Sequence, residues 1–407
     1  MCALLPSQGR PAVSQSKTLQ RFLAISGAAR TEPELTMSLH IREVQASADF
    51  NTLRDDWNRL VQLEGAGVHG FDASATFEWS EALWDAYPAH RPKCILVAQD
   101  AQGVRGLLPC TVAPDSIARV IHRRLTPTAG VYDLRTGFLV GGDADVLASL
   151  LAHAQSRVVG WDVLACRTVD GSLSERALTG ALTRLRWSRV VLREWRTPYI
   201  ALPQQPDAVL DGISQKLRSN VRRAERQVQK MGTLTTRFFE AEESVQGFLE
   251  LMTAVEAQSW KMQAGTAMVT SAHQRKMYDA VTGALSKFGR FLGAATFLDE
   301  RPLAFIYGYA LNGVFVDEKE SYVDEFKDFG PGNVLKVQFL QELVRRGIST
   351  LDYGGEEDPH KARWTDKTYS RKIHALFNTT WRGQLLRLSL PVRSLMSRGV
   401  APQRPVD

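Results

Sequence analysis

Two stretches near the C-terminal end combine β-strand character with side chains that can move protons. Glu318 and Glu320 lie in an expected strand over residues 314–323, and Asp352 lies in another over 348–353. Burying a run of polar side chains in a central strand is costly unless the strand borders a cleft. The sequence therefore predicts a site between these strands, where a carboxylate could take a proton from a nucleophile. The alternative is an exposed strand face.

Alternation along the strand over 314–323 sorts its polar side chains into two groups. Glu318, Glu320 and Tyr322 are expected on one face, with Lys319 and Ser321 on the other. The first face would then carry the candidate base.

Several further residues could either transfer a proton or have a purely structural role. Tyr353 or Tyr369 could protonate a leaving group, or each could be a buried structural tyrosine. Asp352 could be catalytic or could anchor the loop that follows it. His360, which titrates near neutrality, is a rival base or a surface histidine beside a proline.

Between the two strands, the sequence Phe329-Gly330-Pro331-Gly332-Asn333 leads into an expected helix over 333–346. The first backbone N–H groups of a helix have no partner inside it and attract anions. The glycines leave no side chain in the way, the proline stiffens the approach, and the asparagine can cap the helix or lie in its first turn. The absence of a following Lys-Ser/Thr and of GxGxxG spacing excludes a nucleotide-hydrolysing P-loop and a dinucleotide fold. The motif predicts either a phosphate site or a plain turn.

A strongly basic helix is expected over residues 214–230. An apolar stripe at helical spacing is formed by Leu217, Val221, Ala224 and Val228. The cations that outweigh its single glutamate are Lys216, Arg218, Arg222, Arg223, Arg226 and Lys230. They predict either a solvated face or an anion site.

The bulk composition limits the classes of function. The chain has 407 residues, 44% of them hydrophobic, which allows a large core and two domains, and its net charge of +6 is too small to mark a nucleic-acid binder. No run approaches the ~18 apolar residues of a membrane helix. The cysteines, Cys2, Cys94, Cys110 and Cys166, lack metal-binding spacing, which argues for a reducing compartment and against a bound metal.

The order of expected elements repeats along the chain. Strands are expected over 94–98, 105–112, 161–166, 190–195, 235–239, 290–297 and 303–311, and helices over 49–63, 77–87, 145–156, 174–185, 245–260 and 274–288. The hairpin over 94–112 corresponds to the hairpin over 290–311, and the strand over 161–166 to the one over 350–353. The sequence predicts an α/β (α+β) fold of two tandem modules, with mixed sheets flanked by helices and the first module degenerate.

The expected division of the chain follows from this repeat. Residues 1–36, rich in Ser and Ala with no acid before Glu32, should be a disordered or non-native tail, although a transit peptide has a similar composition. We expect the degenerate N-terminal module over 37–205, the basic linking helix over 206–234, the C-terminal module over 235–390 and a flexible tail over 391–407.

Three stretches carry a family resemblance when taken in order. They are KLRSNVRRAER at 216–226, Ser259-Trp260-Lys261 with Gly265-Thr266-Ala267, and residues 319–336 followed by LDYGGEEDPHKARW at 351–364. Together they resemble the GNAT acyltransferases, and more closely the CelD-like acetyltransferases linked to bacterial exopolysaccharide synthesis. That group belongs with the Fem-type peptidoglycan transferases, which are built of tandem GNAT modules.

The resemblance implies an acyl-CoA donor, such as acetyl-CoA, held between the strands over 314–323 and 348–353, and no metal. Its pyrophosphate would lie at Gly330, Gly332, Asn333, Val334 and Leu335. The catalytic candidates are Glu320, Asp352 and Tyr353. Contacts to the acceptor are expected from Trp260, Lys261, His360, Lys361, Trp364 and Arg222. The plainer interpretation of Trp260 is a core anchor, and that of Lys261 is a solvated charge.

The expected function is that of an acyl-CoA-dependent N-acyltransferase of the bacterial cytoplasm. Its acceptor would be a small-molecule or carbohydrate amine, as in a sugar or cell-envelope (exopolysaccharide) precursor, with no DNA partner and no transmembrane segment. One alternative is a Fem-type aminoacyl-tRNA-dependent transferase, in which the basic helix would meet RNA phosphates. Such enzymes often carry a long helical arm, and the sequence shows no coiled-coil insertion of that kind. The other alternative is a non-catalytic GNAT-fold binding protein.

Overall fold

The computed structural model describes residues 39–65, 67–117, 119–126 and 137–396. The expected tail over 1–36 lies outside these residues. Of the expected tail over 391–407, the first part belongs to the last helix, α11 (Trp381–Met396), and the rest lies outside the described residues. None of the helices in these ranges is both long and apolar enough to cross a membrane.

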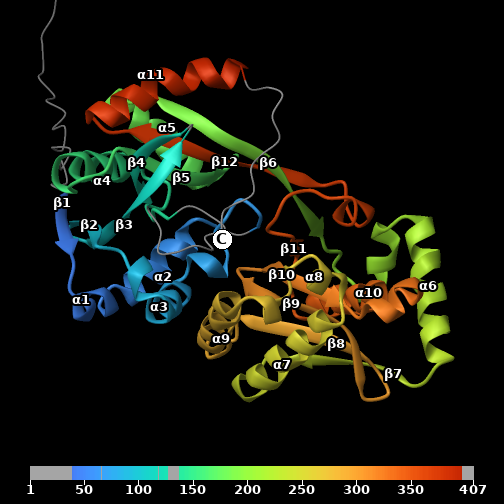
Figure 1. Ribbon diagram of the computed structural model, residues 1–407. Helices are drawn as coiled ribbons and strands as arrows, with labels where there is room; N and C mark the ends of the chain where they lie inside the picture. Colours follow the sequence, from blue (N-terminus) through green and yellow to red (C-terminus); the bar gives the residue numbers. More distant parts are fainter. Residues whose placement is uncertain (1–38, 66, 118, 127–136, 397–407) are drawn as a thin grey trace, which may run out of the picture. The chain divides into compact units, whose positions relative to one another are not determined.

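The first half of the chain folds as a strand, a group of helices, a three-stranded meander, a helix, a strand, a helix and a strand (Figure 1). Its elements are β1 (His40–Val44), α1 (Ser47–Asn51), α2 (Arg54–Leu63), α3 (Phe77–Ala86), β2 (Cys94–Asp100), β3 (Gly103–Ile117), β4 (Val120–Thr126), α4 (Ala144–Arg157), β5 (Val163–Val169), α5 (Leu173–Leu185) and β6 (Arg189–Ala201).

The second half follows the linking helix α6 (Gln215–Gln229) and largely repeats that order. Its elements are β7 (Leu234–Phe239), α7 (Val245–Ala257), α8 (Trp260–Gln263), α9 (Ala272–Ser286), β8 (Phe291–Leu298), β9 (Arg301–Leu311), β10 (Val314–Tyr322), α10 (Pro331–Arg345), β11 (Thr350–Asp352), β12 (Thr368–Phe377) and α11. Each half has one parallel strand pair, β4 with β5 and β10 with β11, in an otherwise antiparallel arrangement. The predicted α/β fold with a repeated module is confirmed.

The two modules form one sheet in the order β1-β2-β3-β4-β5-β12-β6-β11-β10-β9-β8-β7. β6 joins them, because residues 189–198 pair with β12 and residues 199–201 pair with β11. β12 lies between β5 and β6, so a strand from the C-terminal end completes the sheet of the first module. Each module therefore depends on a strand from the other half of the chain.

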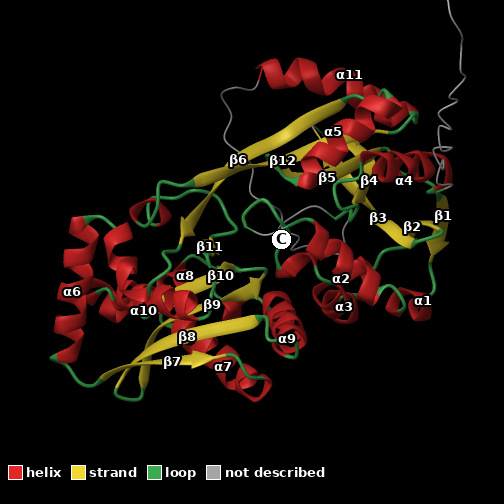
Figure 2. Cartoon of the chain, turned by 180° about the vertical axis from the view of Figure 1, so that it is seen from behind, coloured by secondary structure: helices red, strands yellow, loops and turns green. Residues whose placement is uncertain are grey.

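Helices cover both faces of this sheet (Figure 2). Over the strands of the second module, α10 and α6 pack on one face and α7 and α9 on the other. Over the first module, α4 and α5 cover one face, while α2, α3 and α11 cover the other. The buried stripe of α6 consists of Leu217, Val221, Ala224 and Val228, as its spacing predicts.

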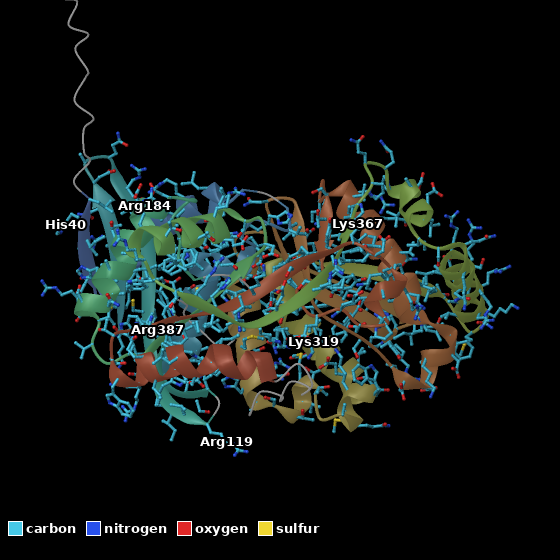
Figure 3. All side chains as sticks on the ribbon, turned by 90° about the horizontal axis from the view of Figure 1, so that it is seen from above. His40, Arg119, Arg184, Lys319, Lys367 and Arg387 are labelled. Carbon is cyan, nitrogen blue, oxygen red and sulfur yellow. The ribbon has the colours of Figure 1, made fainter. Side chains whose placement is uncertain are left out.

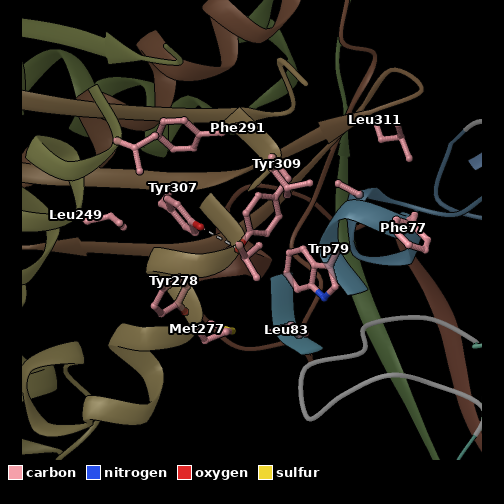
Figure 4. Close-up of a cluster of buried hydrophobic side chains, with 14 of the residues drawn as sticks. Phe77, Trp79, Leu83, Leu249, Met277, Tyr278, Phe291, Tyr307, Tyr309 and Leu311 are labelled. Atoms are coloured by element: carbon pink, nitrogen blue, oxygen red, sulfur yellow. Dashed lines mark hydrogen bonds between the residues drawn. The ribbon is translucent and has the colours of Figure 1, made fainter. Parts of the chain in front are cut away.

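A shared apolar core holds the modules together (Figure 4). Trp79 of α3 stands edge-on against Tyr309 of β9, with ring centroids 4.9 Å apart. The Tyr307 hydroxyl lies 3.0 Å from the Tyr309 hydroxyl in the same cluster. Nearby, Arg290 donates to the buried Glu78 carboxylate at 2.6 Å, which pairs a charge of one module with a charge of the other.

The structure corrects several expected elements. The helix expected over 49–63 is divided by a turn at Thr52, although its apolar stripe is buried as predicted. The helix expected over 245–260 ends at Ala257, because the Ser259 hydroxyl caps the separate helix α8 by accepting from the Lys261 N–H at 3.2 Å. β1, β4, β12 and α11 were not predicted.

A close backbone approach shapes β10. A bulge between Asp317 and Lys319 interrupts its pairing with β9, where Gly308 lies opposite Asp317. A Cβ atom on Gly308 would come within 1.9 Å of the Val316 carbonyl oxygen and 2.6 Å of Phe315 Cζ. Backbone atoms cannot yield as a flexible side chain can, so only glycine fits here.

Replacing Gly308 should therefore destabilise the fold. We expect Gly308→Ala to lower the free energy of unfolding by about 3 kcal/mol, since overpacked sites lose about that much. Gly283→Ala in α9 is the matched control, because a Cβ there meets nothing within 4 Å, and it should raise stability by about 0.5–1 kcal/mol. Urea unfolding curves of both variants measure the difference, and equal stabilities would contradict the close approach.

Candidate active site

The candidate site lies where β10 and β11 separate. Only residues 314–316 of β10 pair with β11, through Thr350–Asp352. β11 then ends, while β10 continues to Tyr322 paired with β9 alone. The edge of β10 over residues 317–322 is thus unpaired by any described strand. Strand edges of this kind offer backbone N–H and C=O groups to a ligand.

A buried lysine stands at the point of separation. Lys336 of α10 is 1% exposed, and its Nζ lies 2.5 Å from Asp317 Oδ2 and 2.7 Å from Glu320 Oε2. Both carboxylates come from the part of β10 that is no longer paired with β11. A buried ammonium is tolerated only when it is paired in this way. The lysine therefore ties α10 to the open part of β10.

The two carboxylates respond differently to this environment. Burial raises the pKa of Asp317 to about 6, although Lys336 opposes the shift. Burial would raise the pKa of Glu320 as well, but Lys336 and His360 outweigh it and hold that pKa below its ordinary value. Glu320 is therefore ionised at neutral pH and can accept hydrogen bonds.

His360 lies beside Glu320, with Nδ1 3.4 Å from Glu320 Oε1, and its side chain is 48% exposed. Burial lowers the pKa of His360 against the opposing pull of Glu320, so the ring is neutral at pH 7. The nearby Glu320 carboxylate favours the tautomer with the proton on Nδ1, which leaves Nε2 as an acceptor. The structure thus brings together the predicted base and its predicted rival.

The expected alternation along β10 is wrong because of the bulge. Glu318 lies on the same side as Lys319, where the hydroxyl of Tyr278 meets its carboxylate and the Lys319 Nζ stands 5.4 Å from the Tyr278 ring. Burial raises the pKa of Glu318 to about 7, although Lys319 opposes the shift. Glu318 therefore does not share a face with Glu320.

Lys261 reaches the site from α8. Its Nζ donates to the Glu320 carbonyl oxygen at 2.7 Å and pairs with the buried Glu256 carboxylate at 3.1 Å. Lys319 pairs with the same carboxylate at 3.2 Å. Glu256 also accepts from the Met268 N–H at 2.8 Å, which fixes the loop after α8. Lys261 is consequently held in place rather than solvated.

Tyr353 and Trp364 follow β11 and pack in the apolar cluster beneath α10. Among the described residues, neither the Tyr353 hydroxyl nor the Trp364 Nε1 has a hydrogen-bond partner, although both atoms are buried. Burial raises the pKa of Tyr353 well above its ordinary value, so the hydroxyl keeps its proton. Lys361 Nζ lies 5.9 Å from the Tyr353 ring and donates to the Glu356 carbonyl oxygen.

Asp352 is fully buried and its carboxylate is engaged by its own surroundings. Its Oδ2 accepts from the Tyr369 hydroxyl at 2.7 Å, and its Oδ1 accepts from the Gly354 N–H at 2.8 Å. These two contacts anchor the loop that follows β11.

The helix α10 begins two residues earlier than expected. Gly330 is its N-terminal cap residue, in the left-handed region at φ 59°, and no side chain caps the helix. Asn333 lies in the first turn, one of its two expected places, where its N–H donates to the Gly330 carbonyl and its Oδ1 lies 3.4 Å from an Arg363 nitrogen. The Gly332 N–H has no partner among the described residues. The side chains of Val334 and Leu335 are buried, so only their backbone could meet a ligand.

The basic helix α6 packs against α10 at this end. A Cβ on Gly330 would lie 3.7 Å from the Ala224 Cβ, so the middle of α6 is next to the start of α10. Arg222 is exposed on α6, and among the described residues it has no ion-pair partner. Trp260 of α8 is exposed rather than a core anchor.

Sequence reasoning missed the centre of this cluster. Lys336 and Asp317 were not among the predicted site residues, nor was Glu256. The signal for Lys336 was a lone lysine on the apolar stripe of α10, beside Val337 and Leu340. Among the described residues, no three His, Cys, Asp or Glu side chains are grouped as metal ligands.

Comparison with known proteins gives a family for part of the chain. Residues 215–362 match the model of an acetyltransferase (GNAT) domain. This stretch, which includes β10, α10 and β11, is a GNAT acetyltransferase domain. No match was found among the curated proteins.

Two solved structures share the fold over most of the chain. The crystal structure of FemX aligns with a TM-score of 0.57 at 13% identity, covering 86% of this chain and 99% of that one. A conserved protein of unknown function from Bacteroides thetaiotaomicron aligns with a TM-score of 0.51 at 12% identity, covering 83% and 100%. At these identities the likeness concerns the fold alone.

The buried ion cluster should make stability depend on Lys336. We expect Lys336→Met to lower the free energy of unfolding by about 3–5 kcal/mol at pH 7.5, because it leaves two buried carboxylates without a counter-charge. Without that lysine, the folded pKa of each carboxyl rises above its unfolded value. The difference from the wild type should therefore shrink as pH falls toward the unfolded pKa values, near 4.

Urea unfolding of wild type and variant at pH 7.5 and 5 measures this difference. The double variant Asp317→Asn/Lys336→Met is the control, since it removes one of the stranded charges and should recover part of the loss at pH 7.5. A loss that is the same at both pH values would contradict the electrostatic explanation.

Proposed function

We propose that the protein is an N-acyltransferase that moves an acyl group, acetyl in the simplest case, from coenzyme A to an amine. The observation that supports this most is the separation of β10 from β11 beside the uncapped start of α10, inside the GNAT domain. A strand edge, a free helix N-terminus and a proton-transfer pair are the parts that such a reaction requires.

We assign the donor phosphates to the start of α10. The Gly332 N–H is free, no side chain caps the helix, and the exposed cations of α6 lie alongside. The equivalent helix of the first module, α4, is capped by the Asp143 carboxylate, which accepts from the N–H groups of Asp145 and Val146. That carboxylate occupies the place of an anion. We therefore assign the donor site to residues 235–390 and regard 37–205 as the degenerate module.

His360 is the group that we assign to deprotonate the acceptor. Its neutral ring lies at the surface of the site, with Nδ1 3.4 Å from Glu320 Oε1. Nε2 can then take a proton from the ammonium of the acceptor. Glu320 is a positioning residue in this scheme, and Lys336 keeps it ionised.

Tyr353 is the group that we assign to the leaving thiolate. As the amine nitrogen bonds to the thioester carbon, the C–S bond breaks, and the sulfur takes the Tyr353 proton. The second proton that the nitrogen loses in becoming an amide then restores the Tyr353 hydroxyl. The unpartnered buried hydroxyl supports this role, since a buried donor without a partner is rare unless a ligand supplies one. The free edge of β10 offers N–H groups to the carbonyl oxygen of the intermediate.

The acceptor that fits these surroundings is a cationic amine on a sugar. Lys336 compensates only one of the two carboxylates, Asp317 and Glu320, which favours a positive ligand. Trp260, exposed beside Lys261, offers an aromatic face of the kind that packs against sugar rings. The three family-like stretches favour a CelD-like enzyme of the bacterial cytoplasm that acylates a cell-envelope or exopolysaccharide precursor.

A second candidate is a transferase that uses aminoacyl-tRNA. The exposed cations of α6 support it, since RNA phosphates would suit the same face. The first candidate binds an acyl-CoA and the second binds an aminoacyl-tRNA, so binding measurements with each ligand separate them.

Donor binding should depend on the space at Gly332. A side chain there would meet only Tyr322 Cδ1, at 3.7 Å, so Gly332→Val should fold normally. It should nevertheless raise the Kd for acetyl-CoA about tenfold or more, because the new side chain would lie between the backbone and the pyrophosphate. Gly247→Val, at an unobstructed position of α7, is the matched control and should bind as the wild type does.

Isothermal calorimetry measures both affinities. Unchanged binding by Gly332→Val would contradict the placement of the phosphates. Absence of binding to any acyl-CoA by the wild type, together with tight binding of aminoacyl-tRNA, would favour the second candidate.

The role of His360 predicts a pH profile. We expect His360→Gln to lower kcat by about 10²–10³-fold with little change in donor affinity, as expected for loss of a general base. In the wild type, kcat should rise with pH through the lowered pKa of His360, below 6.5, and level off above it. His153→Gln, on α4, is the control and should keep both kcat and profile. If His360→Gln shows the same rise of kcat with pH as the wild type, His360 is not the general base.

A further inference from the structure

The last helix, α11, is fixed in one rotational setting. The Thr380 hydroxyl caps it by accepting from the Gly383 N–H at 3.1 Å, and itself donates to Asp162 Oδ1 at 2.7 Å. A Cβ on Gly383 would lie 2.5 Å from the Asn378 carbonyl oxygen and 2.7 Å from that of Asp162. Glycine therefore allows the first turn of the helix to press against backbone, and this contact fixes which side faces inward.

The inward side of α11 is apolar and so is the outward side. Leu386 and Leu390 follow Gly383 at helical spacing and are buried against β5 and β12. Trp381, Leu385 and Leu388 fall on the opposite side and are 69%, 46% and 67% exposed. Since the inward contacts prevent the helix from turning, this outward stripe stays in water in the isolated protein.

Arginines border the outward stripe on both sides. At 100° per residue, Arg382 lies on one flank and Arg387, which is labelled in Figure 3, on the other, and both are exposed. Among the described residues, neither has an ion-pair partner, and the Arg382 guanidinium stands 4.7 Å from the Trp381 ring. An apolar stripe with arginines along its edges is the pattern of a helix that lies in a membrane interface.

The helix α11 itself carries cations and no acid. Residues 381–396 contain Arg382, Arg387 and Arg393 and no Asp or Glu. The described acids near the start of α11 are internal, since the Asp162 carboxylate accepts from Thr380 and from the Arg123 N–H. A cationic surface of this kind attracts anionic headgroups, at about 1 kcal/mol for each cation near them.

We propose that the outward face of α11, defined by Trp381, Leu385, Leu388, Arg382 and Arg387, docks the protein on the surface of an anionic phospholipid bilayer. The apolar stripe enters the boundary between headgroups and acyl chains, and the arginines meet lipid phosphates. A second copy of the chain fits less well, because two such faces would bring arginines against arginines. The proposal does not depend on acyl transfer, since the helix packs on β12 and β5, away from β10.

Flotation of the full chain with vesicles tests this docking. The protein should float with vesicles of phosphatidylcholine and phosphatidylglycerol at 3:1. With vesicles of phosphatidylcholine alone it should remain in the bottom fraction of the gradient. Leu388→Glu should lower the partition coefficient at least tenfold, because it puts a carboxylate into the stripe. Val159→Glu, at a position 88% exposed outside α11, is the matched control and should bind as the wild type does.

Leu388→Glu should keep the wild-type melting temperature and acetyl-CoA affinity, since Leu388 is mostly in water. Loss of vesicle binding with donor binding intact would therefore separate this proposal from the proposed activity. Equal flotation of Leu388→Glu and wild type, or no flotation of the wild type, would overturn the proposal. Light scattering that shows a wild-type dimer dissociated by Leu388→Glu would overturn it in favour of a second copy.

Discussion

The contact of Lys336 with Asp317 and Glu320 is the interaction on which the candidate site depends. A strand that loses its neighbour normally loses its support, and β10 loses β11 after Val316. The lysine replaces part of that support by tying the strand to α10, and it leaves the backbone edge free. A hydrophobic side chain could fill the same volume, but it would leave Glu320 without the charge that keeps it ionised beside His360. The buried ammonium of Lys336 thus both supports β10 and keeps Glu320 ionised.

The two modules share a plan but differ at the start of one helix. In α4 the Asp143 carboxylate satisfies the free N–H groups, whereas α10 starts at Gly330 with no side-chain cap. A capped helix start is stable without a ligand, and an uncapped one needs a ligand or water. The first module instead supplies β6, against which β11 pairs, and the packing of α3 on α9. Its retained role is therefore to complete and hold the second module.

Periodicity in the sequence predicted the repeated fold because apolar spacing is a local property. The stripe of α6 and the hairpin over 290–311 came out as expected. What local spacing could not reveal was pairing between distant segments, such as β12 between β5 and β6. Nor could it reveal the bulge that places Glu318 away from Glu320, because alternation assumes an even strand. Lys336 was missed for a related reason, since its partners are set by how α10 lies on β10.

The net charge of +6 conceals how the charges are distributed. The cations of α6 gather beside the start of α10, and Arg382 and Arg387 are exposed on α11, while several acids lie in the interior. Small totals of this kind arise when basic surfaces are offset by acids that pair inside the fold, as Glu256 and Asp317 do. The net charge of the whole chain is therefore not enough to exclude a strongly cationic surface. A helix can present a strongly cationic face, because potential near a surface depends on the charges within about a Debye length, roughly 8 Å at physiological salt, and not on the total.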